Sequence, residues 1–381
     1  MSGGTALLAR AIFDGDRLFP DSALLIEEGR VRAIVPVSEI PCDAERMDTQ
    51  AALLCPGFVD WQVNGGGGVL FNETPTREGI RAIAAAHARF GTTTLLPTVI
   101  TDAPEVSAAA AQAVAEAIAD GDPAVVGVHF EGPHISLEKC GVHDRGFIRP
   151  LTREDHDRLA RADLGTVVAT LAPENASLED IRTLSRAGVH VSLGHSNADF
   201  ATANAAFRAG AQSVTHLFNA MSGLHHRDPG LAGAALSSAH VYCGLIPDGH
   251  HVHPAMLDLA LRAAGHRRIT LVTDAMSSVG HADDRFELNG RTVVRENGRL
   301  TIADGTLAGS DLDMMSGVRI MADACGAPFH DVLRMASRCP AQMLGLHDRG
   351  HLRPGARADI LALDAERTLI SVWIAGDRQE R

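Results

Sequence analysis

Eight short apolar runs are the feature that most constrains how this chain of 381 residues can fold. Each run has the length of a buried strand, and most are separated from the next by a helical stretch. Eight strand–helix units over roughly 220 residues predict a (β/α)8 barrel of the TIM type better than an open doubly wound sheet. The expected strands are Leu54–Gln62, Thr92–Ile100, Ala124–Glu131, Thr166–Leu171, His190–Gly194, Ser213–Leu217, Val241–Pro247 and Ile269–Asp274.

Most of these strands should be followed by a helix on the outside of the barrel. Ser177 and Asp102 are the expected N-caps of two of them, and only the connection from the sixth to the seventh strand is irregular. Gly65–Gly68 lacks the signature of a phosphate-binding or dinucleotide-binding loop, so we expect a flexible loop at the barrel mouth. The expected helices are Arg77–Phe90, Glu105–Ala119, Arg153–Ala162, Leu178–Ala187, Ala198–Ala209 and Pro254–Ala264.

Short β-rich segments occur at both ends of the chain. They predict a small β-sandwich domain built from residues 1–55 and 347–381, beside a barrel domain of residues 56–346. After the last barrel strand, Asn289-Gly290 and Asn297-Gly298 predict hairpin turns in a β-like insert of about residues 285–302. Two further helices are expected at about Met314–Cys325 and Phe329–Leu344.

Composition excludes several classes of protein. The formal net charge of −13 disfavours general nucleic-acid binding. No apolar run reaches the ~18 residues of a membrane span, and the N-terminus does not resemble a signal peptide. The six cysteines are scattered without a Cys-x-x-Cys pair, which favours free thiols and a cytoplasmic location.

Four ionisable residues come at or near the ends of predicted barrel strands: Glu131, His195, His216 and Asp274. Side chains at these strand ends point into the active site of such barrels. Any one of them alone is more simply a hydrogen-bonded core residue or a helix cap, but four at one rim indicate a shared function. Two histidines and two carboxylates suit Zn²⁺ or Fe²⁺.

The four residues suggest a division of roles. A catalytic zinc usually keeps three protein ligands and one open position, and Glu131, His195 and His216 fill three. A divalent ion lowers the pKa of bound water to about 7. Asp274 is then the candidate general base and, later, general acid.

Six motifs carry a resemblance that covers nearly the whole chain, from Pro56 to the tail. Together they resemble the N-acetylglucosamine-6-phosphate deacetylases of the amidohydrolase superfamily. The motifs are His-Phe-Glu-Gly-Pro-His at 129–134, Leu-Gly-His-Ser at 193–196, Thr-His-Leu-Phe-Asn-Ala-Met at 215–221, Pro-Gly-Leu-Ala-Gly at 229–233, Asp-Gly-His-His-Val at 248–252 and Leu-Val-Thr-Asp-Ala at 271–275.

The resemblance implies roles for individual residues. Glu131, His195 and His216 would hold the metal, Asp274 would be the acid and base, and His143 is our candidate for stabilising the oxyanion. Arg227 would reach the site of a neighbouring subunit in a homodimer. The implied substrate-binding residues are Val142, His143, Asn219, Ala220, Arg227, Asp248, His251, Leu307, Ala308 and Gly309.

The sequence departs from many amidohydrolases at the first strand. Where those enzymes carry His-x-His for a second metal, this chain has Gln62 and Asn64, whose amides are poor zinc ligands. The predicted fourth strand has no lysine to bridge two metals, since Lys139, the only lysine, lies in another loop. We therefore expect one divalent ion per subunit, Zn²⁺ or Fe²⁺.

The expected function is hydrolysis of the acetamide of N-acetyl-D-glucosamine 6-phosphate to acetate and D-glucosamine 6-phosphate, in amino-sugar metabolism. One alternative is the galactosamine epimer, which differs in one hydroxyl. A D-aminoacylase-like amidase is less suited, since its substrate has no use for Arg227 and His251. A non-catalytic sugar-phosphate-binding protein on the same scaffold is the alternative from another class, although it would not need Asp274 beside the metal ligands.

Overall fold

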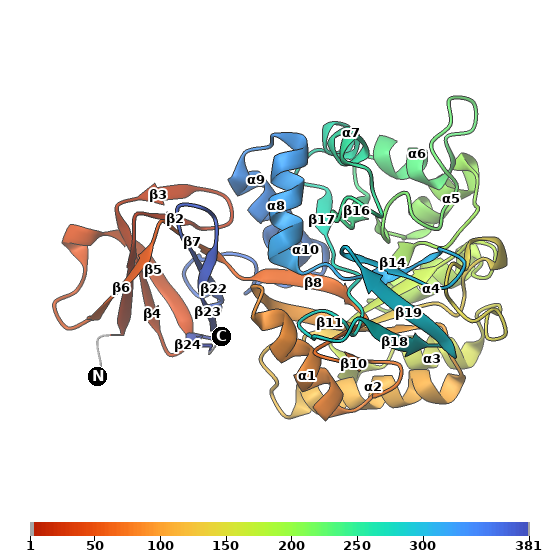
Figure 1. Cartoon of the computed structure of the whole chain (residues 1–381), viewed down its shortest axis with the longest axis horizontal. Coiled ribbons are helices and arrows are strands. Elements are labelled where there is room, and N and C mark those ends of the chain that lie inside the picture. Colours follow the sequence, from red (N-terminus) through yellow and green to blue (C-terminus); the bar gives the residue numbers. More distant parts are fainter. Residues whose placement is uncertain (1–3, 380–381) are drawn as a thin grey trace.

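The computed structural model describes residues 4–379 and contains the predicted barrel (Figure 1). Eight strands form one sheet in which every neighbouring pair is parallel. A parallel bridge between Val63 and Ala275 joins its two edges and closes the barrel. The strands are β8 (Phe58–Val63), β11 (Thr92–Ile100), β12 (Gly127–Glu131), β13 (Thr166–Leu171), β14 (His190–Leu193), β15 (Ser213–Val214), β16 (Tyr242–Leu245) and β17 (Ile269–Leu271).

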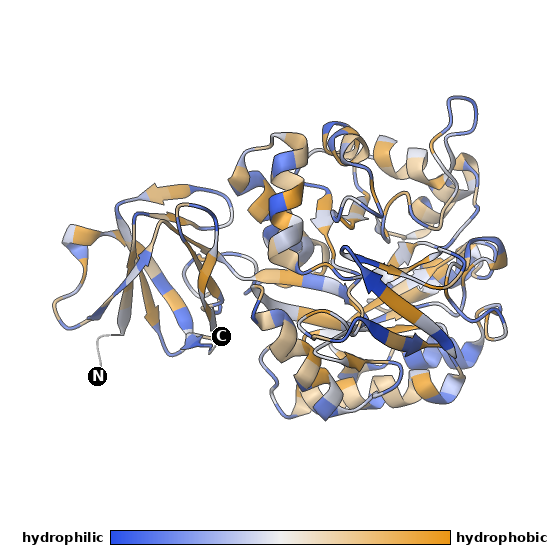
Figure 2. Ribbon diagram, viewed as in Figure 1, coloured by the Kyte–Doolittle hydropathy of each residue, from blue (hydrophilic) through white to orange (hydrophobic). Residues whose placement is uncertain are grey.

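Helices surround this barrel and turn their apolar sides towards it (Figure 2). One of them, α6 (Gly230–Ser237), lies in the connection that looked irregular in the sequence. Seven of its eight residues are buried, so it has no polar face and gives no amphipathic pattern. The others are α1 (Arg77–Ala88), α2 (Pro104–Ala119), α3 (Arg153–Leu159), α4 (Leu178–Arg186), α5 (Phe200–Ala209), α7 (Pro254–Ala264) and α8 (Met314–Cys325).

The two expected helix caps had different outcomes. Ser177 caps α4 in a reciprocal capping box with Asp180, as predicted. Asp102 was wrongly predicted, because α2 begins after Ala103 with Pro104 in its first turn. The Asp102 carboxylate instead accepts hydrogen bonds from the Ala103 N–H at 2.7 Å and from the Asn72 amide at 2.9 Å.

The glycine segment after β8 is also different from our expectation of a flexible loop. Gly65 and Gly66 form a short strand, β9 (Gly65–Gly66), paired with β10 (Val69–Leu70). A Cβ on Gly65 would lie 2.4 Å from the Val69 carbonyl oxygen. The glycines are therefore needed for a tightly packed hairpin at the barrel mouth.

Strands from both ends of the chain share one sheet beside the barrel (Figure 1). Its order is β24-β23-β22-β7-β2-β3, and a second sheet has the order β5-β4-β1-β6. We propose that residues 1–55 and 347–381 form a small β domain and residues 56–346 the barrel domain. The strands are β1 (Thr5–Ala9), β2 (Ala11–Phe13), β3 (Leu18–Pro20), β4 (Ser22–Glu27), β5 (Arg30–Pro36), β6 (Glu45–Ala51), β7 (Leu53–Pro56), β22 (Ile360–Leu363), β23 (Leu369–Ile374) and β24 (Asp377–Arg378).

The run expected as the first barrel strand, Leu54–Gln62, forms two strands that separate at Gly57: β7 belongs to the small sheet and β8 to the barrel. A Cβ on Gly57 would lie 2.1 Å from Thr93 Oγ1, so only glycine fits there without a shift of its neighbour. This close contact places the change of sheet at one residue of a continuously apolar run. Periodicity alone could not locate it.

The segment after the barrel forms the predicted β insert. Asn289 and Asn297 both have positive φ, as hairpin turns require. Its apolar residues pack on Leu70, Ile100 and Met276 near the barrel mouth. The strands are β18 (Arg285–Leu288), β19 (Arg291–Glu296), β20 (Arg299–Thr301) and β21 (Leu307–Ser310), and after α8 follow α9 (Phe329–Ala336) and α10 (Arg338–Met343) in place of one expected helix.

Within residues 4–379, none of the helices combines the length and apolar character that crossing a membrane requires.

A buried ion pair holds the C-terminal segment against the barrel, and we predict that removing it destabilises the fold. Arg357 binds Asp359 at 2.9 and 2.5 Å and also donates to the carbonyl oxygens of Thr93 and Pro123. Arg357→Met leaves the Asp359 carboxylate buried without this partner, so the free energy of unfolding should fall by about 3–5 kcal/mol. Urea denaturation measures the change.

The control is Arg32→Met, which removes an exposed ion pair with Glu27 at 3.7 Å. Its effect should stay within about 1 kcal/mol. Equal losses of stability in the two variants would contradict a special role for the buried pair.

Candidate functional site

A cavity of about 360 Å³ opens at the carboxyl ends of the barrel strands. It contains the metal-site residues and Asp274 together, as the barrel prediction requires. Side chains or backbone from strand ends, from the loop after β12 and from the β insert form its walls. The lining residues are Asn64, Ile100, Glu131, Glu138, Lys139, Gly141, Val142, His143, His195, His216, Asn219, Ala220, Ile246, His251, Asp274, Met276, Thr306, Leu307 and Gly309.

Each of the four strand-end residues enters the cavity at the end of a buried strand or within three residues of it. Glu131 is the last residue of β12. His195, His216 and Asp274 follow β14, β15 and β17, and all three have positive φ, between 35° and 51°. Non-glycine residues rarely adopt this conformation, and such strain is typical of functional sites. The backbone thus turns sharply where each strand ends and aims the side chain inward.

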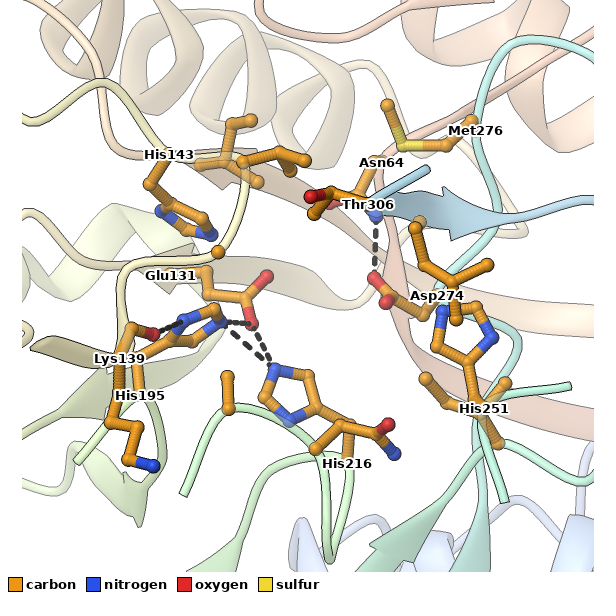
Figure 3. Close-up of a pocket in the computed structure, with 18 of the residues that line it drawn as sticks. Asn64, Glu131, Lys139, His143, His195, His216, His251, Asp274, Met276 and Thr306 are labelled. Atoms are coloured by element: carbon orange, nitrogen blue, oxygen red, sulfur yellow. Dashed lines mark hydrogen bonds and ion pairs between the residues drawn. The ribbon is translucent and has the colours of Figure 1, made fainter. Parts of the chain in front are cut away.

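Glu131, His195 and His216 form a compact cluster (Figure 3). Glu131 Oε1 lies 3.2 Å from His195 Nε2 and 3.0 Å from His216 Nε2, and the two Nε2 atoms are 3.0 Å apart. The Lys139 carbonyl oxygen accepts a hydrogen bond from His195 Nδ1 at 2.8 Å. Because that bond places the ring proton on Nδ1, the lone pair of Nε2 points into the cluster.

The chemistry of this donor set fits a divalent cation. A carboxylate oxygen and two imidazole nitrogens that converge on one point offer lone pairs to each other, which is unfavourable unless a positive charge lies between them. Glu–His–His is a common ligand set for zinc with a position left open. Burial alone would raise the pKa of Glu131, but the two neighbouring histidines hold that pKa well below its usual range, so Glu131 offers a carboxylate to the cation.

Asp274 lies across the cavity from this cluster (Figure 3). Asn64 donates to Asp274 Oδ1 at 2.7 Å, and Gln62 Nε2 donates to the same oxygen at 3.1 Å. The Gln62 amide also lies 3.2 and 3.3 Å from the two oxygens of Glu131. Gln62 therefore supplies N–H donors to both buried carboxylates, and Asn64 supplies one to Asp274. Burial, and then the charge of Glu131, raise the pKa of Asp274 to about 6.

His143 faces the cluster from the loop after β12 (Figure 3). The Thr101 backbone N–H donates to His143 Nδ1 at 3.4 Å, and the Thr101 hydroxyl lies 2.7 Å from the same atom. Nδ1 is therefore the acceptor, and the ring proton is on Nε2. Burial, followed by the nearby His195, lowers the pKa of His143 to about 3, so its ring is neutral.

The structure places most, but not all, of the implied substrate-binding residues at this cavity. Three do not line it. Ala308 is completely buried behind its neighbours. Asp248 instead binds His251, and the distance from Asp248 Oδ2 to His251 Nδ1 is 2.6 Å. Arg227 lies exposed on the loop before α6, outside the cavity of its own chain. Those that line it are Val142, His143, Asn219, Ala220, His251, Leu307 and Gly309.

Several lining residues escaped the sequence analysis. Glu138 and Lys139 come from a single turn of 3₁₀ helix, η2 (Leu137–Lys139), that follows β12. Thr306 comes from the β insert, and Ile100 and Met276 add apolar wall. No periodicity marks a loop residue as pocket-facing. The one signal in the sequence is the rarity of lysine, since Lys139 is the only one in the chain.

Comparison with known proteins agrees with this geometry. The model of the Amidohydrolase family matches residues 53–378. A curated relative from Shewanella sp. (strain ANA-3), an N-acetylgalactosamine-6-phosphate deacetylase, is 45% identical over 89% of this chain and 86% of its own. The N-acetylglucosamine-6-phosphate deacetylase of Pasteurella multocida has a crystal structure with a TM-score of 0.95 at 33% identity, covering 99% of this chain and 100% of its own.

A second solved structure is an aspartate-to-alanine variant of the N-acetyl-D-glucosamine-6-phosphate deacetylase of Mycobacterium smegmatis, in complex with N-acetyl-D-glucosamine 6-phosphate. It has a TM-score of 0.92 and 33% identity, covering 98% of both chains. The family match spans most of the chain, and the cavity, the ligand cluster and the facing aspartate are all in place. This chain is therefore a member of the amidohydrolase family, hydrolases that act on amide C–N bonds.

Proposed function

We propose that this chain hydrolyses the acetamide of N-acetyl-D-glucosamine 6-phosphate to D-glucosamine 6-phosphate and acetate. The observation that carries the proposal is the arrangement of Asp274 facing the Glu131–His195–His216 cluster across one cavity. A binding protein would have no use for a carboxylate of raised pKa opposite a metal-ligand set. The relatives named above act on amino-sugar 6-phosphates.

We infer that Glu131, His195 and His216 hold one divalent ion per chain. Zn²⁺ is our first choice, and Fe²⁺ is the alternative with the same ligand preference. A divalent ion bound there supplies Lewis acidity and lowers the pKa of a water molecule. Gln62 and Asn64 occupy the positions where other amidohydrolases hold a second ion, and their N–H groups already bind Asp274.

The protein's own residues divide the proton transfers. Asp274 takes the proton of the attacking water on its carboxylate and later gives it to the departing amine nitrogen, as general base and then general acid. Asn64 and Gln62 hold the carboxylate in place during both steps. His143 donates its Nε2–H to the amide oxygen as that oxygen gains negative charge, and its neutral state suits this role.

We also propose a homodimer in which Arg227 completes the site of the neighbouring subunit. Arg227 is exposed, and none of the carboxylates within residues 4–379 pairs with it. It belongs to the loop before α6, which extends from the barrel (Figure 1). The exposed Leu224 and the paired rings of His225 and His226, 4.3 Å apart, lie on the same loop.

We propose a cytoplasmic location for the protein, because all six of its cysteines are free thiols.

The galactosamine epimer is a second candidate substrate, because the Shewanella relative, at 45% identity, acts on N-acetylgalactosamine 6-phosphate by its name. Acetate release from metal-reconstituted protein tests both. We expect a higher kcat/KM with N-acetylglucosamine 6-phosphate than with its epimer, and a much lower value with unphosphorylated N-acetylglucosamine. The reverse order of the epimers would exchange the two candidates, and no acetate from any sugar would refute the proposed function.

Asp274→Asn should abolish most activity without emptying the metal site. An amide cannot accept the water proton, so we expect kcat to fall by about 10²–10⁴, while metal content measured by atomic absorption stays at the wild-type level. His253→Ala, in an exposed helix cap outside the cavity, controls for general perturbation. Wild-type turnover in the Asn variant would remove Asp274 from the mechanism.

Arg227→Met should weaken use of the phosphorylated substrate, and a second subunit should restore it. Loss of one charge-assisted contact should raise KM about tenfold or more. Co-expression of this variant with Asp274→Asn then makes mixed dimers. In one of their two sites, Asp274 and the neighbour's Arg227 are both present, so activity should reappear. No recovery in purified mixed dimers would show that Arg227 does not act across subunits.

A further inference from the structure

Lys139 is the only lysine of the chain, and it lines the cavity that holds the proposed active site. The chain has 34 lysines and arginines, and only this one is lysine. It is also the one lysine or arginine among the residues that line the cavity in the described chain. A protein that uses arginine everywhere else thus has its one lysine beside the metal-ligand cluster.

The backbone of Lys139 is fixed to that cluster. Its N–H donates to the Ser136 carbonyl oxygen at 3.2 Å, and the Ser136 N–H in turn donates to the His195 carbonyl oxygen at 2.8 Å. The Lys139 carbonyl oxygen accepts the His195 Nδ1–H at 2.8 Å. The side chain therefore begins from a rigid point, on the side of the cluster away from Asp274 and His251 (Figure 3).

The Lys139 ammonium makes no hydrogen bond or ion pair with the described part of the chain. None of the carboxylates in residues 4–379 forms an ion pair with it. Its neighbour Glu138 instead accepts a hydrogen bond from the Asn197 amide at 2.6 Å. Three N–H donors of a half-buried lysine are thus available to a molecule in the cavity.

The charge of the cavity needs such a group. Glu131, Asp274 and Glu138 all line it, and two of these carboxylates are buried. A phosphate dianion that enters would be repelled unless a cation faces it. Arg227 is outside the cavity of its own chain, and the Nδ1 of His251 is already bound to Asp248. Lys139 is the only permanent cation that one chain places at the cavity among the residues described.

We propose that the Lys139 ammonium binds the phosphate group of the substrate and so selects phosphorylated over unphosphorylated sugars. The proposal rests on the proposed function for the identity of the sugar phosphate. A compact ammonium on a flexible stem suits a phosphate as a point charge. Because the hydrogen bond from the metal-ligand His195 goes to the backbone carbonyl of Lys139, a change of the side chain leaves that support intact.

The test compares Lys139→Met with Lys139→Arg. Selectivity is the ratio of kcat/KM for N-acetylglucosamine 6-phosphate to kcat/KM for N-acetylglucosamine. Lys139→Met removes the charge at nearly constant size, so selectivity should fall about tenfold or more. Lys139→Arg should retain part of it. Metal content should equal that of the wild type in both variants, since the Lys139 carbonyl oxygen still holds His195.

Arg186→Met is the matched control, because it removes one exposed positive charge from the last turn of α4, outside the cavity. Its selectivity should be that of the wild type. An unchanged selectivity in Lys139→Met, or a fall of the same size in Arg186→Met, would overturn the proposal. Either result would leave the proposed deacetylation itself standing.

Binding of inorganic phosphate, measured by calorimetry on the metal-loaded protein, separates the two proposals. Lys139→Met should bind phosphate about tenfold more weakly than the wild type. This holds even if the wild type deacetylates neither sugar, in which case the proposed function fails and the phosphate site stands. Equal phosphate affinity in the two proteins would refute the role of Lys139.

Discussion

The closure of the barrel is the contact on which the site depends. Ala275, just after β17, bridges to Val63 at the end of β8, and the Asp274 N–H donates to the Gln62 carbonyl oxygen at 3.0 Å. The side chains repeat this connection, since Asn64 binds the Asp274 carboxylate at 2.7 Å. The same seam therefore joins the first and last strands and orients the proposed acid and base. If the barrel failed to close, the closed sheet and the placement of Asp274 beside Asn64 would both be lost.

Buried negative charge is the main electrostatic cost of the site. Glu131 and Asp274 share one cavity, and a third carboxylate, Asp60, lies beneath it, where burial raises its pKa to about 7. Each has specific donors. The Asp60 carboxylate accepts the Thr273 hydroxyl at 2.6 Å, and Gln62 Nε2 contacts both Glu131 and Asp274. The neutral amide of Gln62 thus lies between the carboxylates of Glu131 and Asp274, which would otherwise repel each other. The ligands for a cation, Glu131, His195 and His216, lie together on one side of the cavity.

Much of this architecture could be predicted from the sequence, because long buried strands and amphipathic helices leave clear periodic patterns. The boundaries of β11, β13 and α8 are those expected. The position of the metal-ligand cluster follows from strand order alone. Residue type gives no sign, however, that His195 and His216 adopt positive φ. It also could not show α6, which is buried on nearly every side, or the position of Lys139 at the cavity, which follows from the hydrogen bond between its backbone carbonyl and His195.

The shared sheet at the two ends of the chain has a consequence for biosynthesis. In it, Leu54 pairs with Ala362 and Cys55 with Leu361, partners that are about three hundred residues apart in the chain. Contacts of such long range form slowly and cannot form until both partners exist. During translation β7 and then the barrel strands leave the ribosome before β22, so the edge of β7 that pairs with β22 stays unpaired until β22 is made. A nascent chain that stalls before Ile360 therefore carries an exposed strand edge on β7, which β22 covers once it has been made.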